Sequence, residues 1–357
     1  MSTTRRRLTA TRHASFAGVA VLCVLAHGCS IYYRTAPADP RGDEVFPLTS
    51  SEAMLAAAIK ADVEHLSNTI GPRALPVWSV AIRDEAEAPE ILVDKGRLPG
   101  PLVEAAVWIE ERLRSMGYMP GRIGYEVDSA EVWNIEVTVP GSGDSAESVV
   151  VGAHYDTVPG TPGADDNASA VAALLALASR LRDAEPSRTL RLVWFVNEEL
   201  PFLRTRHMGS RVYAEWLASQ GVTVSSMVCL DMLGYYDPSP GSQRFPRFVR
   251  RSLPDTGDFV GFVATRDDYR SMRRALDAFR ASTRLPGEGV AIRGAARSDH
   301  WWFVEMGVPS VLITDTAEFR NPHYHRQSDT PETLDYDRLA LCVVGLEGLV
   351  RYLGEGG

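Results

Sequence analysis

The stretch from residue 152 to residue 170, GAHYDTVPGTPGADDNASA, holds the side chains best suited to chemistry. It contains one histidine, His154, and three aspartates, Asp156, Asp165 and Asp166, and it follows the apolar run SVVV. Carboxylates that are brought together away from water repel one another and lose their hydration unless a positive charge lies among them. The pattern therefore indicates a bound cation, and the turn-forming run VPGTPG would fold the chain around it.

Three later segments carry similar side chains at comparable places. Glu198 and Glu199 follow the apolar run LRLVWFV, Asp231 follows SSMVCL, and His325 lies beyond SVLIT. Each apolar run is a predicted strand, and ligands of α/β sheets collect beyond the carboxyl ends of the strands. We expect these side chains to converge with those of the first segment on one rim.

Two imidazoles with several carboxylates and no thiolate suit zinc or a similar divalent ion. A bridging carboxylate, with one imidazole and one terminal carboxylate for each ion, would hold two ions and leave room for a water between them. Neighbouring side chains on an extended segment diverge. One of the pair Glu198 and Glu199 can therefore bind metal while the other takes a proton from the water.

The surrounding pattern predicts an α/β fold with a mostly parallel mixed central sheet and helices on both faces, because Val/Ile/Leu runs alternate with amphipathic helices. Strands are predicted at 133–139, 148–155, 189–196, 224–233, 258–265 and 310–314. Helices are predicted at 49–66, 100–117, 168–181, 210–220, 268–282 and 334–353. Ser50 or Ser51 is the expected N-cap of the first helix and Asn167 that of the third. Residues 49–357 are expected to form one domain.

The motifs HYD, GADDNASA, NEE, LDM, SDH and HRQSDT, in this order between about residues 50 and 353, resemble the M28 family of zinc peptidases. The resemblance implies the zinc exopeptidase fold (phosphorylase/hydrolase-like), two Zn²⁺ ions and a peptide substrate. It also implies five metal ligands: His154, Asp166, Glu199, Asp231 and His325. By the same comparison Asp166 is the bridging ligand, Glu198 is the general base and Asp156 orients the first histidine.

Some assignments remain open at this level. His323 could replace His325 as ligand, although the spacing of His325 to the following Asp-Thr matches the family. Asp299 is expected either to support a ligand or to cap a helix, and His300 to pack at a helix start. Asp165 is expected to be structural.

These residues favour an aminopeptidase, because the carboxylates of Glu198, Glu199 and Asp231 could hold a free amine. The nearest basic residues that could clamp a C-terminal carboxylate lie in loops, and they are Arg204, Arg206 and Arg326. A glutaminyl-cyclase-like acyltransferase, which shares the fold but uses one zinc, is one alternative, and a carboxypeptidase is another. A catalytically silent domain is disfavoured, because unpaired buried carboxylates are costly. The loops 200–208 and 235–258 depart from the family pattern beside the expected site.

The net charge of −9 gives no basic footprint for nucleic acid. Four arginines precede the apolar stretch 14–26, so residues 1–29 are predicted to be an export signal. Cys29 resembles the acylated cysteine of a bacterial lipoprotein, with an uncleaved anchor as the alternative. Residues 30–48 would then be a tether, and the protein would lie in the cell envelope, touching membrane only through this anchor. Cys229 and Cys342 are expected to be core residues.

Overall fold

A mixed sheet organises the chain and fixes where the ends of its strands lie. The computed structural model describes residues 33–34, 47–81, 90–93, 100–143, 146–245, 253–295 and 297–357, all within one compact unit, Tyr32–Gly357. The predicted export signal lies outside the described residues, as does most of the predicted tether. Within the tether, two residues form a strand of the sheet.

The sheet has nine strands among the described residues, in the order β1-β10-β9-β11-β8-β6-β7-β5-β4. Their bounds are β1 Tyr33–Arg34, β4 Gly121–Val127, β5 Ala130–Val139, β6 Glu147–His154, β7 Thr189–Phe195, β8 Thr223–Leu230, β9 Val260–Ala264, β10 Gly287–Ala291 and β11 Ser310–Thr314. The four central strands, β7, β6, β8 and β11, run parallel. β5 and β9 flank them in the opposite direction, and β10 pairs in parallel with β9 on its outer side.

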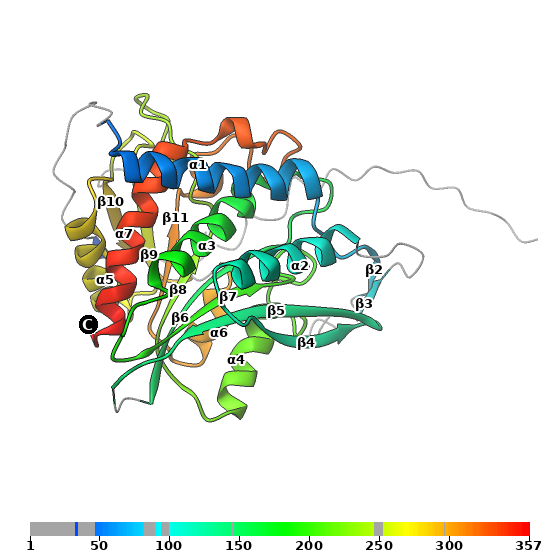
Figure 1. The fold of residues 1–357 in the computed structure, drawn as a ribbon. Helices are drawn as coiled ribbons and strands as arrows, with labels where there is room; N and C mark the ends of the chain where they lie inside the picture. Colours follow the sequence, from blue (N-terminus) through cyan, green and yellow to red (C-terminus); the bar gives the residue numbers. More distant parts are fainter. Residues whose placement is uncertain are drawn as a thin grey trace, which may run out of the picture. The chain divides into compact units, whose positions relative to one another are not determined.

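Helices cover both faces of this sheet, as predicted (Figure 1). Their bounds are α1 Ser50–Glu64, α2 Gly100–Ser115, α3 Ala170–Leu181, α4 Gly209–Ser219, α5 Tyr269–Ser282, α6 His300–Glu305 and α7 Tyr336–Gly354. The first three helices, with α5 and α7, pack on one face in a large apolar cluster. α4 and α6 cover the other face with a smaller cluster around Phe195, Tyr213 and Phe303.

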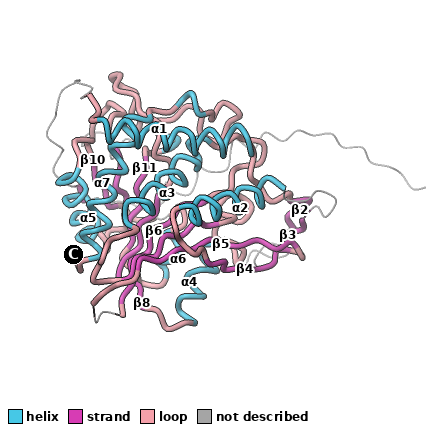
Figure 2. Tube along the Cα trace, in the orientation of Figure 1, coloured by secondary structure: helices cyan, strands magenta, loops and turns pink. Residues whose placement is uncertain are grey.

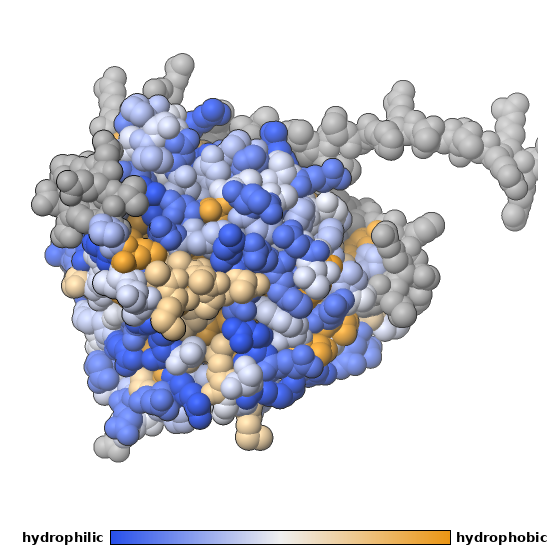
Figure 3. Space-filling model, turned by 45° about the horizontal axis from the view of Figure 1, so that its top comes forward, coloured by the Kyte–Doolittle hydropathy of each residue, from blue (hydrophilic) through white to orange (hydrophobic). Residues whose placement is uncertain are grey.

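The apolar runs that predicted the central strands are buried because both faces are covered. Val149, Val150 and Val151 of β6 are all fully buried, as expected for a strand inside a layered α/β domain. Figure 3 shows a mostly hydrophilic outer surface on the side where α1 is turned forward. None of the described helices is long and apolar enough to cross a membrane.

Several elements differ from the sequence-based prediction. Thr49, not Ser50 or Ser51, is the N-cap of α1, because its hydroxyl accepts from the backbone N–H of Glu52 while the Glu52 carboxylate accepts from the N–H of Thr49. Strands β4 and β10 were not predicted. No strand was predicted between residues 70 and 100, yet this stretch contains a separate two-stranded sheet of β2 Val77–Ala81 and β3 Glu90–Val93 (Figure 2).

Candidate metal centre

The parallel strands bring the predicted chemical side chains to one edge of the sheet. His154 is the last residue of β6, and Asp231 directly follows β8. Glu198 and Glu199 lie just beyond the end of β7, and His325 follows β11 in a loop. Neighbouring parallel strands end at the same edge, so residues far apart in sequence meet there.

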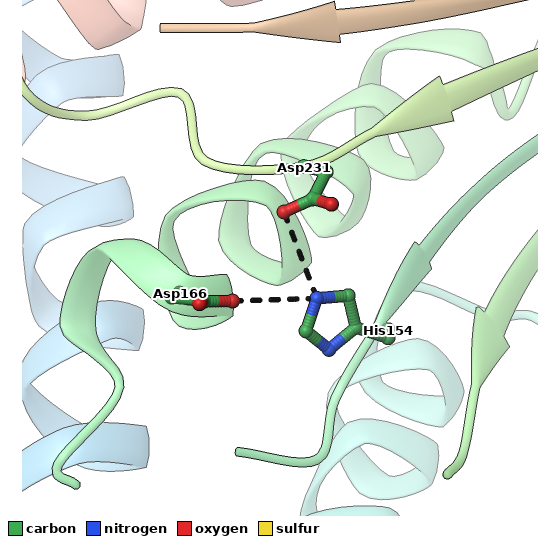
Figure 4. A group of neighbouring side chains, drawn as sticks. All are labelled: His154, Asp166 and Asp231. Carbon is green, nitrogen blue, oxygen red and sulfur yellow. Dashed lines mark ion pairs between the residues drawn. The ribbon is translucent and has the colours of Figure 1, made fainter. Parts of the chain in front are cut away.

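Two groups of three possible metal ligands form at this edge. In the first, Nε2 of His154 lies 3.4 Å from Oδ1 of Asp166 and 3.6 Å from Oδ1 of Asp231 (Figure 4). In the second, Nε2 of His325 lies 3.1 Å from Oδ2 of Asp166 and 3.5 Å from Oε1 of Glu199. The ligand atoms of each group lie within 4.8 Å of one another.

Asp166 belongs to both groups and presents a different carboxylate oxygen to each histidine. This is the arrangement expected of a bridging ligand between two ions. The Oε1 atom of Glu199 is also buried and makes no hydrogen bond within the described part of the chain. A buried, unbonded carboxylate oxygen facing an imidazole is well accounted for by a cation, so the residues present fit a pair of divalent ions.

The electrostatics of the cluster show how strongly its charges interact. Burial works against a charged His325, yet the neighbouring carboxylates of Asp166 and Glu199 raise its pKa to about 11. Burial and the charge of Asp166 raise the pKa of Glu199 to about 7. Burial would raise the pKa of Asp166, but the two histidines lower it. The negative site thus attracts positive charge, which protons supply when no metal is bound.

Glu198 lies beside the two groups without belonging to either. It is buried, and burial raises its pKa well above the usual range, aided by the charges of Glu199, Asp231 and Asp299, while His154 acts in the opposite direction. A carboxylate with a raised proton affinity that lies outside both ligand groups is suited to accept a proton.

Asp156 holds the first histidine and both glutamates in place. Its backbone oxygen lies 3.2 Å from Nδ1 of His154, which directs Nε2 toward the two carboxylates. Its carboxylate oxygens accept from the backbone N–H groups of Glu198 and Glu199, each at 3.1 Å. Oδ1 of the same carboxylate also lies 3.6 Å from Nδ1 of His154, so Asp156 contacts both the histidine and the glutamate segment.

A second aspartate, which the sequence analysis did not single out, supports the bridging ligand. Asp329 accepts from the backbone N–H of Asp165 at 2.8 Å and from that of Asp166 at 3.1 Å. Asp165 is structural, as expected, because its carboxylate accepts from Gly234 N and Asn321 Nδ2. Both contacts span long stretches of chain, so spacing alone carries no signal for them.

Asn167 does not cap a helix, contrary to the prediction. Its Nδ2 donates to the backbone oxygen of Leu230 and its Oδ1 accepts from the N–H of Met232, the two residues that flank Asp231. The side chain therefore joins the segment of the bridging carboxylate to the end of β8, and α3 begins only at Ala170.

Asn134 of β5 holds the segment that carries the two glutamates at both of its ends. Its Oδ1 accepts from Val196 N at 3.1 Å, and its Nδ2 donates to the Gly209 oxygen at 2.9 Å. Tyr125 of β4 adds a bond to the backbone oxygen of His207 at 2.8 Å. These contacts pin the unusual loop 200–208 to the sheet.

The remaining predicted residues occupy distinct places. Asp299 is buried at the start of α6 and neither of its carboxylate oxygens has a hydrogen-bond partner among the described residues. Burial raises its pKa to about 7, and the charge of His154 opposes this. His300 is also buried, whereas His323 bonds Ser328 and stays outside both ligand groups. Asp299 thus neither caps α6 nor contacts a ligand through a hydrogen bond.

The two cysteines of the described chain, Cys229 and Cys342, are buried and unpaired, as expected for core residues. The loop 235–258, described up to residue 245 and from residue 253, is fastened by an isolated bridge between Asp237 and Gly257. The guanidinium of Arg320 lies beneath it and donates to Oε1 of Gln243 at 2.8 Å. Both unusual loops are therefore attached to the body of the protein by buried polar side chains.

Comparisons with known proteins agree with this geometry. The uncharacterized protein YfbL of Escherichia coli (strain K12) is 40% identical over 211 residues, covering 56% of this chain and 64% of YfbL. A probable leucine aminopeptidase of Trichophyton verrucosum is 29% identical over 255 residues, covering 66% and 62%. The chain therefore spans less than two thirds of the length of either relative.

Solved structures share the fold. BSAP, a zinc aminopeptidase from Bacillus subtilis, superposes with a TM-score of 0.61 at 15% identity over 84% of this chain and 95% of its own. Glutaminyl cyclase of Porphyromonas gingivalis gives a TM-score of 0.56 at 20% identity over 84% and 97%. The model of peptidase family M28 matches residues 134–345, which contain all five possible ligands. The chain belongs to peptidase family M28.

Proposed function

We propose that this protein is a zinc-dependent aminopeptidase that removes N-terminal residues from peptides. The observation that carries the proposal is the sharing of Asp166 between two ligand groups, one with His154 and Asp231 and the other with His325 and Glu199. Membership of family M28 and the zinc aminopeptidase among the structures of the same fold agree with it.

The five residues of the two groups would hold two zinc ions, because imidazole and carboxylate without thiolate suit this metal. When bound, a zinc pair polarises a carbonyl group and makes water a nucleophile at neutral pH. Asp166 would join the ions, and Asp156 and Asp329 would hold the ligand segments in place through backbone N–H groups.

Glu198 is proposed to be the general base. In peptide hydrolysis the oxygen of a water forms a bond to the scissile carbon, and the carbon–nitrogen bond then breaks. Glu198 would accept the proton of the attacking water and deliver it to the leaving amine, so that it returns to its starting state. Its raised proton affinity, caused first by burial, supports this role.

The charge of the rim supports recognition of a free amine. Glu198, Glu199 and Asp231 present carboxylates on one side, and the Asp231 side chain remains 20% exposed. Of the basic residues nearby, the guanidinium of Arg204 is stacked 3.7 Å above the ring of Trp301, and Arg206 bonds His207. An α-ammonium group therefore meets more opposite charge at this edge than a C-terminal carboxylate does.

Short peptides with one blocked end test the proposal directly. Acetylation of the N-terminus should abolish cleavage by the zinc-loaded protein, because it removes the positive charge, whereas amidation of the C-terminus should leave cleavage intact. The opposite pattern would make the protein a carboxypeptidase. Release of pyroglutamyl peptides from N-terminal glutamine substrates, without hydrolysis, would make it a glutaminyl-cyclase-like acyltransferase instead.

For its location, we propose an envelope lipoprotein anchored at Cys29. The sequence pattern supports this proposal: four arginines precede the apolar stretch 14–26, and Cys29 follows that stretch as the acylated cysteine of a bacterial lipoprotein does.

Fractionation of cells tests this location. Wild-type protein should be found with membranes, and Cys29→Ser should be soluble or unprocessed, since multiple acyl chains on one cysteine anchor stably. A Cys29→Ser protein that is processed normally to the wild-type size would indicate plain secretion.

A further inference from the structure

Arg73 is a fully buried arginine to which the sequence analysis assigned no role. It follows the turn at Gly71 in an irregular segment between α1 and β2. A buried guanidinium is costly unless hydrogen bonds or opposite charges compensate for its lost hydration. The partners of Arg73 therefore show what the fold uses it for.

Its guanidinium holds both ends of the loop that joins the first histidine to the bridging aspartate. Nε donates to the backbone oxygen of Tyr155 at 2.9 Å, directly after His154. Nη1 donates to the oxygen of Pro162 and Nη2 to that of Gly163, each at 2.9 Å. Nη1 also contacts the backbone oxygens of Leu66 and Gly71 at 2.9 and 3.0 Å.

The backbone of Arg73 adds a second connection to the same loop. Its N–H donates to Oγ1 of Thr157 at 3.0 Å, and its oxygen accepts from the N–H of Thr157 at 3.2 Å. The loop also requires glycine at position 163, which has φ of 60°. A Cβ there would lie 2.3 Å from Cγ2 of Thr157 and 2.5 Å from the backbone oxygen of Asp166, so this corner is closely packed.

The charge of Arg73 complements that of the metal centre. Burial lowers its pKa to about 10, and the charges of Asp329, Asp156 and Asp166 act in the opposite direction, so the group stays positive at neutral pH. The acceptors of the guanidinium's hydrogen bonds are carbonyl oxygens, whereas the balancing carboxylates of Asp156 and Asp166 belong to the ligand segments. Arg73 thus supplies a fixed positive charge close to the carboxylates of the ligand segments.

We propose that Arg73 is a positioning residue of the metal centre. It fixes the loop 155–163 so that Asp166 faces both His154 and His325, and its side chain contacts neither metal nor substrate. The inference rests on the proposed zinc site, but it concerns zinc affinity, which can be measured without any substrate.

Arg73→Lys keeps the positive charge but cannot donate to Tyr155, Pro162 and Gly163 together, since an ammonium lacks the planar fork of guanidinium. Loss of residues that hold metal ligands typically weakens metal binding about 10–100-fold. We expect a shift of this size in the zinc dissociation constant measured by calorimetry. We also expect kcat to fall more than KM changes, because the centre rather than the peptide site is displaced.

Arg112→Lys is the matched control, because the guanidinium of Arg112 makes a two-pronged pair with Asp62 at 3.0 Å that joins α2 to α1 and not to the loop 155–163. It should lower the melting temperature without changing zinc affinity or activity. Wild-type zinc affinity in a folded Arg73→Lys protein would overturn the proposal. If wild-type protein itself binds no zinc, the proposed function fails first.

Thr157→Val provides a second route in case Arg73→Lys does not fold. It keeps the shape of the side chain and the guanidinium, and removes only the hydroxyl that accepts from Arg73 N. A several-fold weaker zinc affinity is expected, and an unchanged affinity would count against the positioning role.

Discussion

Gly209 offers a sharp test of how the glutamate segment is held. A Cβ at this position would lie 2.2 Å from the backbone oxygen of Val196 and 2.4 Å from Oδ1 of Asn134. Both are well below the 3.0 Å that real Cβ atoms keep, and the first is main chain at the end of β7. Gly209→Ala must therefore move the backbone by about 1 Å or less.

That movement of the backbone would weaken three hydrogen bonds. Gly209 N donates to the Val196 oxygen at 2.8 Å, and Asn134 bonds Val196 N and the Gly209 oxygen. At about 0.5–1.5 kcal/mol each, together with overpacking, the loss amounts to about 2–4 kcal/mol. With an unfolding entropy of about 2.1 cal/mol/K per residue, a chain of this length would melt about 3–5 °C lower.

Activity should fall further than stability. Glu198 and Glu199 lie between the two clamped ends, and a displacement of about 1 Å in a catalytic group can cost about 100-fold in rate. We expect kcat to fall about 10–100-fold at a temperature where the variant is fully folded.

The matched control is Gly100→Ala, because no atom of the described residues lies within 4 Å of a Cβ there and α2 begins at this residue. It should be neutral or slightly stabilising. Thermal denaturation and steady-state kinetics of both variants check the reasoning. A Gly209→Ala protein with wild-type melting temperature and wild-type kcat would refute it.

Three other predictions follow from the site and from α1. Zinc-loaded protein should contain close to two ions per chain by elemental analysis; one ion with full activity would favour cyclase chemistry. Glu198→Gln should keep its zinc and lose about 10²–10⁴-fold in kcat, whereas Glu199→Gln should lose zinc. Wild-type turnover by Glu198→Gln would show that Glu198 is not the general base. The hydrogen bonds from Arg284 lower the pKa of Glu52 to about 2, below its ordinary 4.5. The Glu52–Arg284 pair therefore stabilises the fold above about pH 4.5, and this stabilisation is lost as pH falls toward 2. Glu52→Gln should flatten the dependence of the melting temperature on pH in that window. An unchanged dependence would contradict the pairing.

The central part of the fold could be predicted because its signals are local. The Val-rich run of β6 is buried on both faces, and such runs are typical of a covered parallel sheet. The strands missed lie away from the centre: β4 is half exposed along its length, and β10 reads GEGVA, with too few apolar residues to stand out. The capping box of Thr49 and Glu52 was legible in the sequence, but the adjacent serines are equally good caps.

The chemical side chains could also be predicted, whereas the residues that hold them could not. Histidines and carboxylates after buried strands are rare enough to stand out, and the parallel sheet brings them together. Arg73, Asp329 and Asn134 act instead on backbone groups of segments 62 to 164 residues away. Every residue has a carbonyl oxygen and almost every one an N–H, so no residue type marks the acceptor or the donor. These partners become visible only when the fold places a buried side chain against a particular stretch of main chain, which is why zinc affinity in variants of Arg73 reports on the fold as much as on the ligands.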